Sequence, residues 1–160
     1  MAYVRSCMER KASELLSRLG YETYLPVQRE IRQWSDRKKL CERLVLPRMI
    51  FVRCTPSERV KSLSEVPYLY KYITNNGAFT PAVVRDSEME TFVAMVERGG
   101  RTVRVVEKLS PGDFVRVVSG PLSGMECRLV NVEGGRCLAV SLGALGTATM
   151  DLALDTVEKI

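Results

Sequence analysis

The sequence predicts an α+β fold, in which helices packed on an open sheet are followed by a small β barrel. Three observations support it. Helix-start signals lie in the first part of the chain, short β-rich runs separate them, and glycine becomes frequent after residue 109. The 160 residues leave room for one domain of about 100 residues and a module of about 50.

The predicted helices each begin at a capping signal. Ser6-Cys7-Met8-Glu9 and Thr55-Pro56-Ser57-Glu58 both fit a capping box, in which a hydroxyl and a Glu carboxylate satisfy amides of the first turn. Asp86-Ser87-Glu88 opens the third helix, and apolar stripes at helical spacing follow the first and third starts. Gly20 and Gly99-Gly100 are expected to end these two helices.

Strands are predicted around the helices at residues 3–5, 21–28, 48–53, 70–74 and 82–84. The run Met49-Ile50-Phe51-Val52 consists of residue types that favour strands. The order strand–helix–strand–strand–helix–strand–helix indicates an open sheet with helices on one face, which is a ferredoxin-like α+β sandwich.

Short Val- and Leu-rich runs separated by glycines indicate a small barrel after residue 109. The predicted domains are 1–98 and 109–160, joined by a linker of mixed charge at 99–108. Residues 1–108 hold 20 basic and 13 acidic side chains, a net of +7, whereas residues 109–160 hold 4 and 6, a net of −2. Nucleic-acid contact is therefore expected in the first domain, and the slightly acidic barrel fits a protein-binding module.

Composition limits the class of protein. Hydrophobic residues make up 46% and charged residues 27%, which is typical of globular proteins, and no apolar run is long enough to span a bilayer. We expect a cytoplasmic protein without membrane contact. The five cysteines form no C-x-x-C pair and histidine is absent, so we expect free thiols and no metal site or cofactor. No catalytic motif is present, and we expect a binding protein, not an enzyme.

The segment from Pro111 to Gly124 strongly resembles a KOW motif. Gly112-Asp113 makes a turn into a strand, Gly120-Pro121 turns out of it, and Gly124 permits the return. An unrelated SH3-like barrel with the same turn chemistry is the alternative. The resemblance implies a small SH3-like barrel of the KOW type for residues 109–160.

The N-terminal half resembles the NGN domain that accompanies KOW in NusG transcription factors. Residues 44–53 resemble the family's FPGYVFV strand, Val66-Pro67-Tyr68-Leu69 its VPGV segment, and residues 80–88 the stretch leading to its last helix. Residues 21–26 and 32–39 are more specifically similar to the UpxY group of specialised paralogues, which are antiterminators on long surface-polysaccharide operons. The resemblance implies an elongation or antitermination factor that suppresses pausing or termination.

Several positions depart from the family pattern. Ala2 stands where the family usually has Trp, Arg48 replaces a Gly, and Met49 replaces a Tyr. Cys127 occupies the position of a second KOW glycine. These differences fit a divergent paralogue better than a housekeeping factor.

The resemblance implies that an apolar patch binds the clamp helices of the largest subunit of RNA polymerase. Carried over to this chain, the patch comprises Tyr3, Leu46, Pro47 and Met49. The alternative is that these side chains belong to the core. Strand alternation places Met49 on the opposite face from Ile50, and for Ile50 and Phe51 a core position is expected.

A second predicted surface binds nucleic acid, either non-template DNA or nascent RNA. Cations surround one aromatic side chain in residues 29–43, which suits phosphate attraction and base stacking. The alternative is a solvated hairpin, and the second predicted helix offers another candidate patch. The candidate residues are Arg32, Trp34, Arg37, Lys38 and Lys39, with Arg59 and Lys61 on the helix.

In the barrel, Leu122 follows Gly120-Pro121 at a turn, where an exposed apolar side chain suggests a partner. In NusG proteins this loop docks a small-subunit ribosomal protein or the termination factor Rho, and the change at Cys127 predicts weak Rho binding. We expect a monomer. The alternative function is a ribosome-associated or RNA-binding KOW protein.

Overall fold

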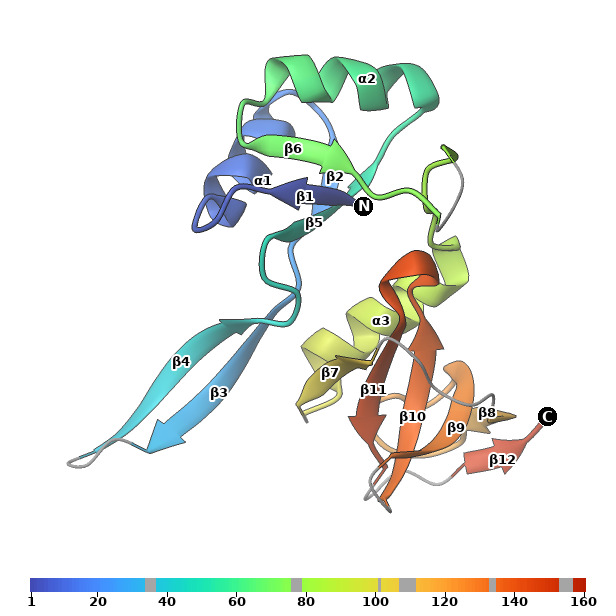
Figure 1. The fold of residues 1–160 in the computed structure, drawn as a ribbon. Coiled ribbons are helices and arrows are strands. Elements are labelled where there is room, and N and C mark those ends of the chain that lie inside the picture. Colours follow the sequence, from blue (N-terminus) through green and yellow to red (C-terminus); the bar gives the residue numbers. More distant parts are fainter. Residues whose placement is uncertain (34–36, 76–78, 101, 107–111, 133–134, 153–156) are drawn as a thin grey trace. The chain divides into compact units, whose positions relative to one another are not determined.

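The chain forms two compact units in a computed structural model (Figure 1). The structure describes residues 1–33, 37–75, 79–100, 102–106, 112–132, 135–152 and 157–160. One unit contains Met1–Pro26 and Leu46–Val83, and the other contains Val27–Val45 and Val84–Ile160. The second unit therefore takes up residues 27–45 and 84–98, which the sequence prediction had assigned to the N-terminal domain.

The first unit is a four-stranded antiparallel sheet with two helices. Its elements are β1 (Ala2–Val4), α1 (Glu9–Arg18), β2 (Glu22–Tyr24), β5 (Met49–Arg53), α2 (Pro56–Glu65) and β6 (Leu69–Tyr72). The strands lie in the order β2-β5-β1-β6. This order is that of a ferredoxin-like sandwich, and the predicted α+β class is confirmed.

Alternation along the strands decides which side chains enter the core of this unit. Ala2 and Val4 of β1 and Ile50 of β5 are buried in one cluster with Leu16 of α1 and Val66 at the end of α2. The two helices therefore cover one face of the sheet. The intervening strand residues point to the opposite face.

The two predicted capping boxes differ in outcome. In α2, Thr55 Oγ1 accepts from the Glu58 amide at 3.4 Å, and Glu58 Oε2 accepts from the Thr55 amide at 2.7 Å, as predicted. The box predicted at Ser6 is wrong, because α1 begins at Glu9 without a side-chain cap. The Glu9 carboxylate instead accepts from the Arg48 amide at 2.9 Å.

The second unit combines a hairpin, a helix and a six-stranded antiparallel sheet. Its elements are β3 (Val27–Gln33), β4 (Lys38–Leu44), α3 (Asp86–Arg98), β7 (Val103–Val106), β8 (Asp113–Val117), β9 (Glu126–Val132), β10 (Gly135–Ser141), the 3-10 turn η1 (Gly143–Leu145), β11 (Thr147–Asp151) and β12 (Val157–Lys159). The large sheet has the order β12-β8-β9-β10-β11-β7, whereas β3 and β4 pair with each other. Its strands β8 to β12 are the small β domain that was expected after the sandwich.

Three predicted segments differ in detail. The strand predicted at 21–28 is divided into β2 and β3, because Pro26 has no amide for a continuous ladder. Residues 82–84 form no strand: the pairing here is limited to an isolated bridge between Thr74 and Pro81, beside which the Ala82 amide bonds the Ile73 carbonyl at 2.8 Å, and the chain then enters α3. Within the segment predicted as a linker, Val103–Val106 forms β7 and pairs with β11.

Gly112, at the start of the KOW-like segment, lies where no side chain fits. A Cβ atom at this position would overlap the carbonyl of Leu129. The glycine therefore permits close approach of the chain entering β8 to β9. Among the described residues, no helix is long and apolar enough to cross a membrane.

Candidate functional sites

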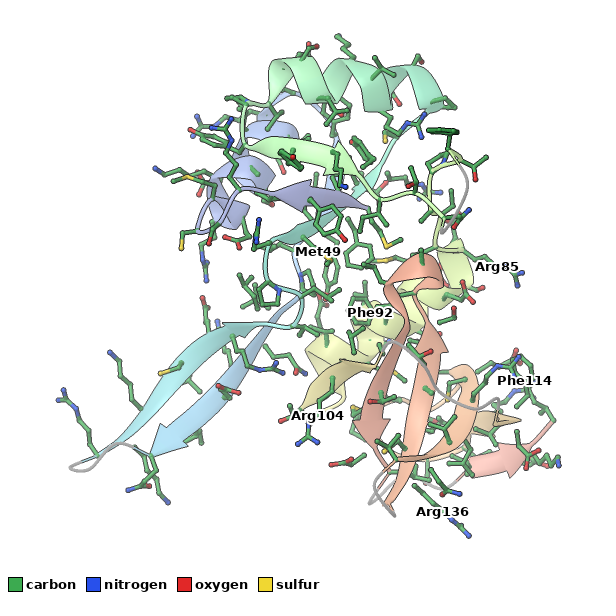
Figure 2. All side chains as sticks on the ribbon, in the orientation of Figure 1. Met49, Arg85, Phe92, Arg104, Phe114 and Arg136 are labelled. Carbon is green, nitrogen blue, oxygen red and sulfur yellow. The ribbon has the colours of Figure 1, made fainter. Side chains whose placement is uncertain are left out.

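The predicted polymerase patch is built on the sheet face opposite α1 and α2. Tyr3 and Met49 are direct partners in the antiparallel ladder of β1 and β5. Both are half-buried, whereas Ile50 is fully buried on the other face, as the alternation predicted. The ammonium group of Lys71 lies 5.7 Å from the centroid of the Tyr3 ring. Tyr3 and Met49 thus form an apolar pair with a cation at its edge; Figure 2 labels Met49 on β5.

The other two patch residues lie in the loop before β5. Pro47 is exposed, but Leu46 is buried, so Leu46 offers little surface to a partner. Of the four predicted residues, Tyr3, Pro47 and Met49 therefore keep exposed surface. Phe51 is buried, as expected, beside Tyr24, with ring centroids 6.4 Å apart.

Arg48 holds the loop in an unusual conformation. Its φ is 63°, in the left-handed region that favours glycine, and this is the position where the family pattern has a glycine. Its amide donates to the buried carboxylate of Glu9 at 2.9 Å, and its carbonyl accepts from the Val4 amide at 2.8 Å. These two bonds stabilise the conformation and position Pro47 and Met49 beside β1.

The predicted nucleic-acid residues fall on the hairpin and on α2. Arg37, Lys38 and Lys39 are exposed on the hairpin. In the ladder, Arg32 is the backbone partner of Lys39. Trp34 lies outside the described residues.

The α2 candidates make contacts of their own. Lys61 is ion-paired with Glu65 at 3.5 Å, four residues along the helix, and Arg59 is half-buried. The hydroxyl of the neighbouring Ser62 lies 2.8 Å from the hydroxyl of Tyr72 on β6. Burial raises the pKa of Tyr72 to about 12. This contact locks α2 onto the sheet.

A polar clamp that sequence reasoning missed holds the base of the hairpin. Gln28 Oε1 accepts from the Val103 amide at 2.8 Å, and Gln28 Nε2 donates to the Val96 carbonyl at 3.3 Å. Arg43, the ladder partner of Gln28, donates to the Val103 carbonyl at 3.0 Å and pairs with Glu30 at 3.2 Å. The clamp joins the hairpin to α3 and β7. Gln28 and Arg43 lie far from Val103 in the sequence, and no local pattern predicts that they bond to it.

The prediction for Leu122 is wrong. Leu122 is 1% exposed and belongs to the core, although Gly120 and Pro121 before it are exposed. Gly120 has a φ of 94°, and the turn that it begins directs Leu122 inward. Gly120-Pro121 alone offers no large apolar surface.

An exposed aromatic side chain of the small β domain lies on β8 instead. Phe114 is 51% exposed, and the guanidinium carbon of Arg128 lies 3.9 Å from the centroid of its ring. The two residues are ladder partners on β8 and β9 (Figure 2 labels Phe114). Phe114 lies in the KOW-like segment, but the turn at Gly120-Pro121 favoured Leu122 as the predicted contact residue.

The cysteines are free thiols, as expected. Cys127 and Cys137 are buried and Cys7 is exposed. Burial, with a hydrogen bond to Asp151, raises the pKa of the Cys137 thiol. Among the described residues, no group of His, Cys, Asp and Glu side chains could hold a metal ion.

The fold and these surfaces define a mixed α/β protein with a ferredoxin-like sheet and a small β domain. Residues 1–93 match the family model described as transcription termination factor nusG. Because this match covers more than half of the chain, the protein belongs to the NusG family. The chain is also 26% identical to the transcription termination/antitermination protein NusG of Pseudomonas aeruginosa over 162 residues, covering 98% of this chain and 90% of that protein.

Proposed function

We propose that the protein is a transcription antitermination factor that binds RNA polymerase and suppresses pausing or termination. The observation that carries this proposal is the Tyr3–Met49 pair on the sheet face opposite the helices, in a chain of the NusG family. An apolar pair beside an exposed proline suits a helical partner, to which the flexible Met side chain adapts. The partner surface in this proposal is the clamp helices of the largest polymerase subunit.

The factor would act by binding, without chemistry of its own. A protein that binds the closed, elongating state of the polymerase better than the open, paused state increases the population of the elongating state. The ratio of elongating to paused polymerase would rise by at most the ratio of the two affinities. The Arg48–Glu9 contact supports this role because it holds the patch in one conformation before binding.

Nucleic-acid contact is the second part of the proposal. The exposed Arg37, Lys38 and Lys39 on the hairpin would follow the phosphates of non-template DNA or nascent RNA once the polymerase has placed the strand beside them. We expect weak binding to nucleic acid alone and tighter binding in the assembled complex.

We further propose that the small β domain is a KOW module and that the protein serves long surface-polysaccharide operons, as the UpxY-like segments suggest. A ribosomal protein remains a candidate partner of this module. The exposed Phe114, stacked by Arg128, is the surface we propose for such a partner. With Leu122 buried, the loop after Gly120-Pro121 lacks an exposed apolar side chain for a partner, which is in keeping with the weak Rho binding that we propose.

Co-sedimentation of the full chain with purified core RNA polymerase, and in parallel with ribosomes, tests the proposal. We expect saturable binding to polymerase and a shorter pause in single-round transcription on a pause-containing template. Binding to ribosomes without binding to polymerase would contradict the proposal and support the ribosome-associated alternative. A housekeeping NusG serves as the positive control for polymerase binding.

A further inference from the structure

The outer part of the β3–β4 hairpin carries two exposed aliphatic side chains. Ile31 is 70% exposed and Leu40 is 60% exposed. They are direct ladder partners, so their side chains lie side by side on one face of the hairpin. A single exposed Leu is common, but a cross-strand pair forms a continuous apolar surface.

The fold of the second unit does not need this apolar pair. Ladder alternation places Ile31 and Leu40 on the face opposite Gln28 and Arg43, and those two residues make the clamp to α3 and β7. The clamp stabilises the hairpin at its base, which matters because an isolated two-stranded hairpin is only marginally stable. The hairpin is therefore held at its base by other residues, and Ile31 and Leu40 remain on its exposed outer part; Figure 1 shows the hairpin as a separate two-stranded sheet.

The neighbours of the pair on the same face are charged. One step towards the hairpin base, Arg29 and Glu42 form an exposed pair with 4.0 Å between their charged atoms. One step towards the tip stands the exposed Lys38. Protein-binding surfaces typically have an apolar centre and a polar rim. The nearest charged residue towards the tip, Lys38, is positive and would favour an acidic partner.

We propose that Ile31 and Leu40 dock an acidic segment of RNA polymerase that carries apolar side chains, as a second protein contact of this factor. The inference rests on the proposed binding to polymerase and adds a contact separate from the Tyr3–Met49 patch. A protein fits better than nucleic acid, because aliphatic side chains do not stack on bases as aromatic ones do. Lys39 lies on the opposite face of the hairpin, where it can still contact phosphate.

The test compares the full-length Ile31→Thr/Leu40→Thr variant with the wild type for binding to core RNA polymerase free of nucleic acid. Threonine keeps the strand preference of both positions, so circular dichroism and melting temperature should not change. We expect an affinity loss of about tenfold or more with an unchanged salt slope, because the contact is apolar. Lys38→Glu should also weaken binding, since the proposed partner is acidic.

Matched variants separate the outcomes. Val60→Thr removes an equally exposed aliphatic residue from α2 and should bind as the wild type does. Wild-type affinity of the double variant, alongside weakened binding by Met49→Asp, would overturn the second contact and leave the proposed function intact. If the wild type itself does not bind polymerase, both proposals fail. A defect confined to protein-free DNA or RNA would overturn the protein partner and indicate a nucleic-acid contact.

Discussion

Gln28 accepts a hydrogen bond from the backbone amide of Val103 at 2.8 Å, across 75 residues of sequence. Arg43 donates to the carbonyl of the same residue at 3.0 Å. β7 is the last strand of its sheet, and these two side chains satisfy the donor and acceptor that a further strand would otherwise pair. Two side chains at the base of the hairpin thus satisfy the backbone amide and carbonyl of Val103 at the outer edge of β7.

Replacing Gln28 with Leu should destabilise the protein by about 1–3 kcal/mol, because the Val103 amide would lose its acceptor in a buried site. Urea unfolding measures the loss, and hydrogen exchange at Val103 should accelerate. Gln33→Leu, at an exposed position of the same strand, is the control. Equal stability of the two variants would contradict a structural role for the clamp.

Met49→Asp should weaken polymerase binding without unfolding the domain. An unpaired carboxylate in an apolar interface costs on the order of 2 kcal/mol or more, which is a loss of about 30-fold or more in affinity. The measurement is a titration with core polymerase, with Val60→Asp on α2 as the control for added charge. A large drop in melting temperature would instead show that Met49 has a core role.

Replacing Arg37, Lys38 and Lys39 together with Ala should lower affinity for the elongation complex and flatten its dependence on salt. Each lost phosphate contact reduces the slope of log affinity against log salt by about 0.7–0.9. Binding measured from low to moderate salt gives the slope. If the slope is the same as that of the wild type, these residues form only a solvated tip of the hairpin. Arg59→Ala/Lys61→Ala tests the α2 patch in the same assay.

Leu122→Ala should cost about 2–5 kcal/mol of stability, because the side chain is removed from a filled core. Phe114→Ala, at a half-exposed position, should cost less in the same urea titration and affect partner binding instead. A cost for Leu122→Ala below that for Phe114→Ala would restore the original prediction of an exposed Leu122.

The raised pKa of the Tyr72 hydroxyl predicts that the protein loses stability at alkaline pH. Its pKa is raised from 10.0 to about 12, so above pH 10 the unfolded chain releases this proton while the folded chain keeps it. Stability from this group is therefore present below pH 10 and lost as the pH rises towards 12. Tyr72→Phe should lose the Ser62 contact at every pH but show a flatter decline between pH 10 and 11. Parallel declines for the two proteins would contradict the shift.

Features that depend on neighbouring residues could be predicted from the sequence. The α2 capping box follows from Thr55 and Glu58, three positions apart, and the opposite faces of Met49 and Ile50 follow from the period of a strand. Strand and helix order was enough to predict the ferredoxin-like sheet. These outcomes rest on backbone geometry, which acts over a few residues.

Features that depend on distant partners could not be predicted in this way. Glu9 bonds the Arg48 amide in place of the predicted cap at Ser6, and Gln28 bonds the Val103 amide. Leu122 follows a turn, as predicted, but its side chain enters the core because burial of a large apolar group outweighs the preference of turns for polar residues. A side chain bonds or packs with whichever partner the folded chain brings close to it. The local sequence does not show which distant residues will be brought close.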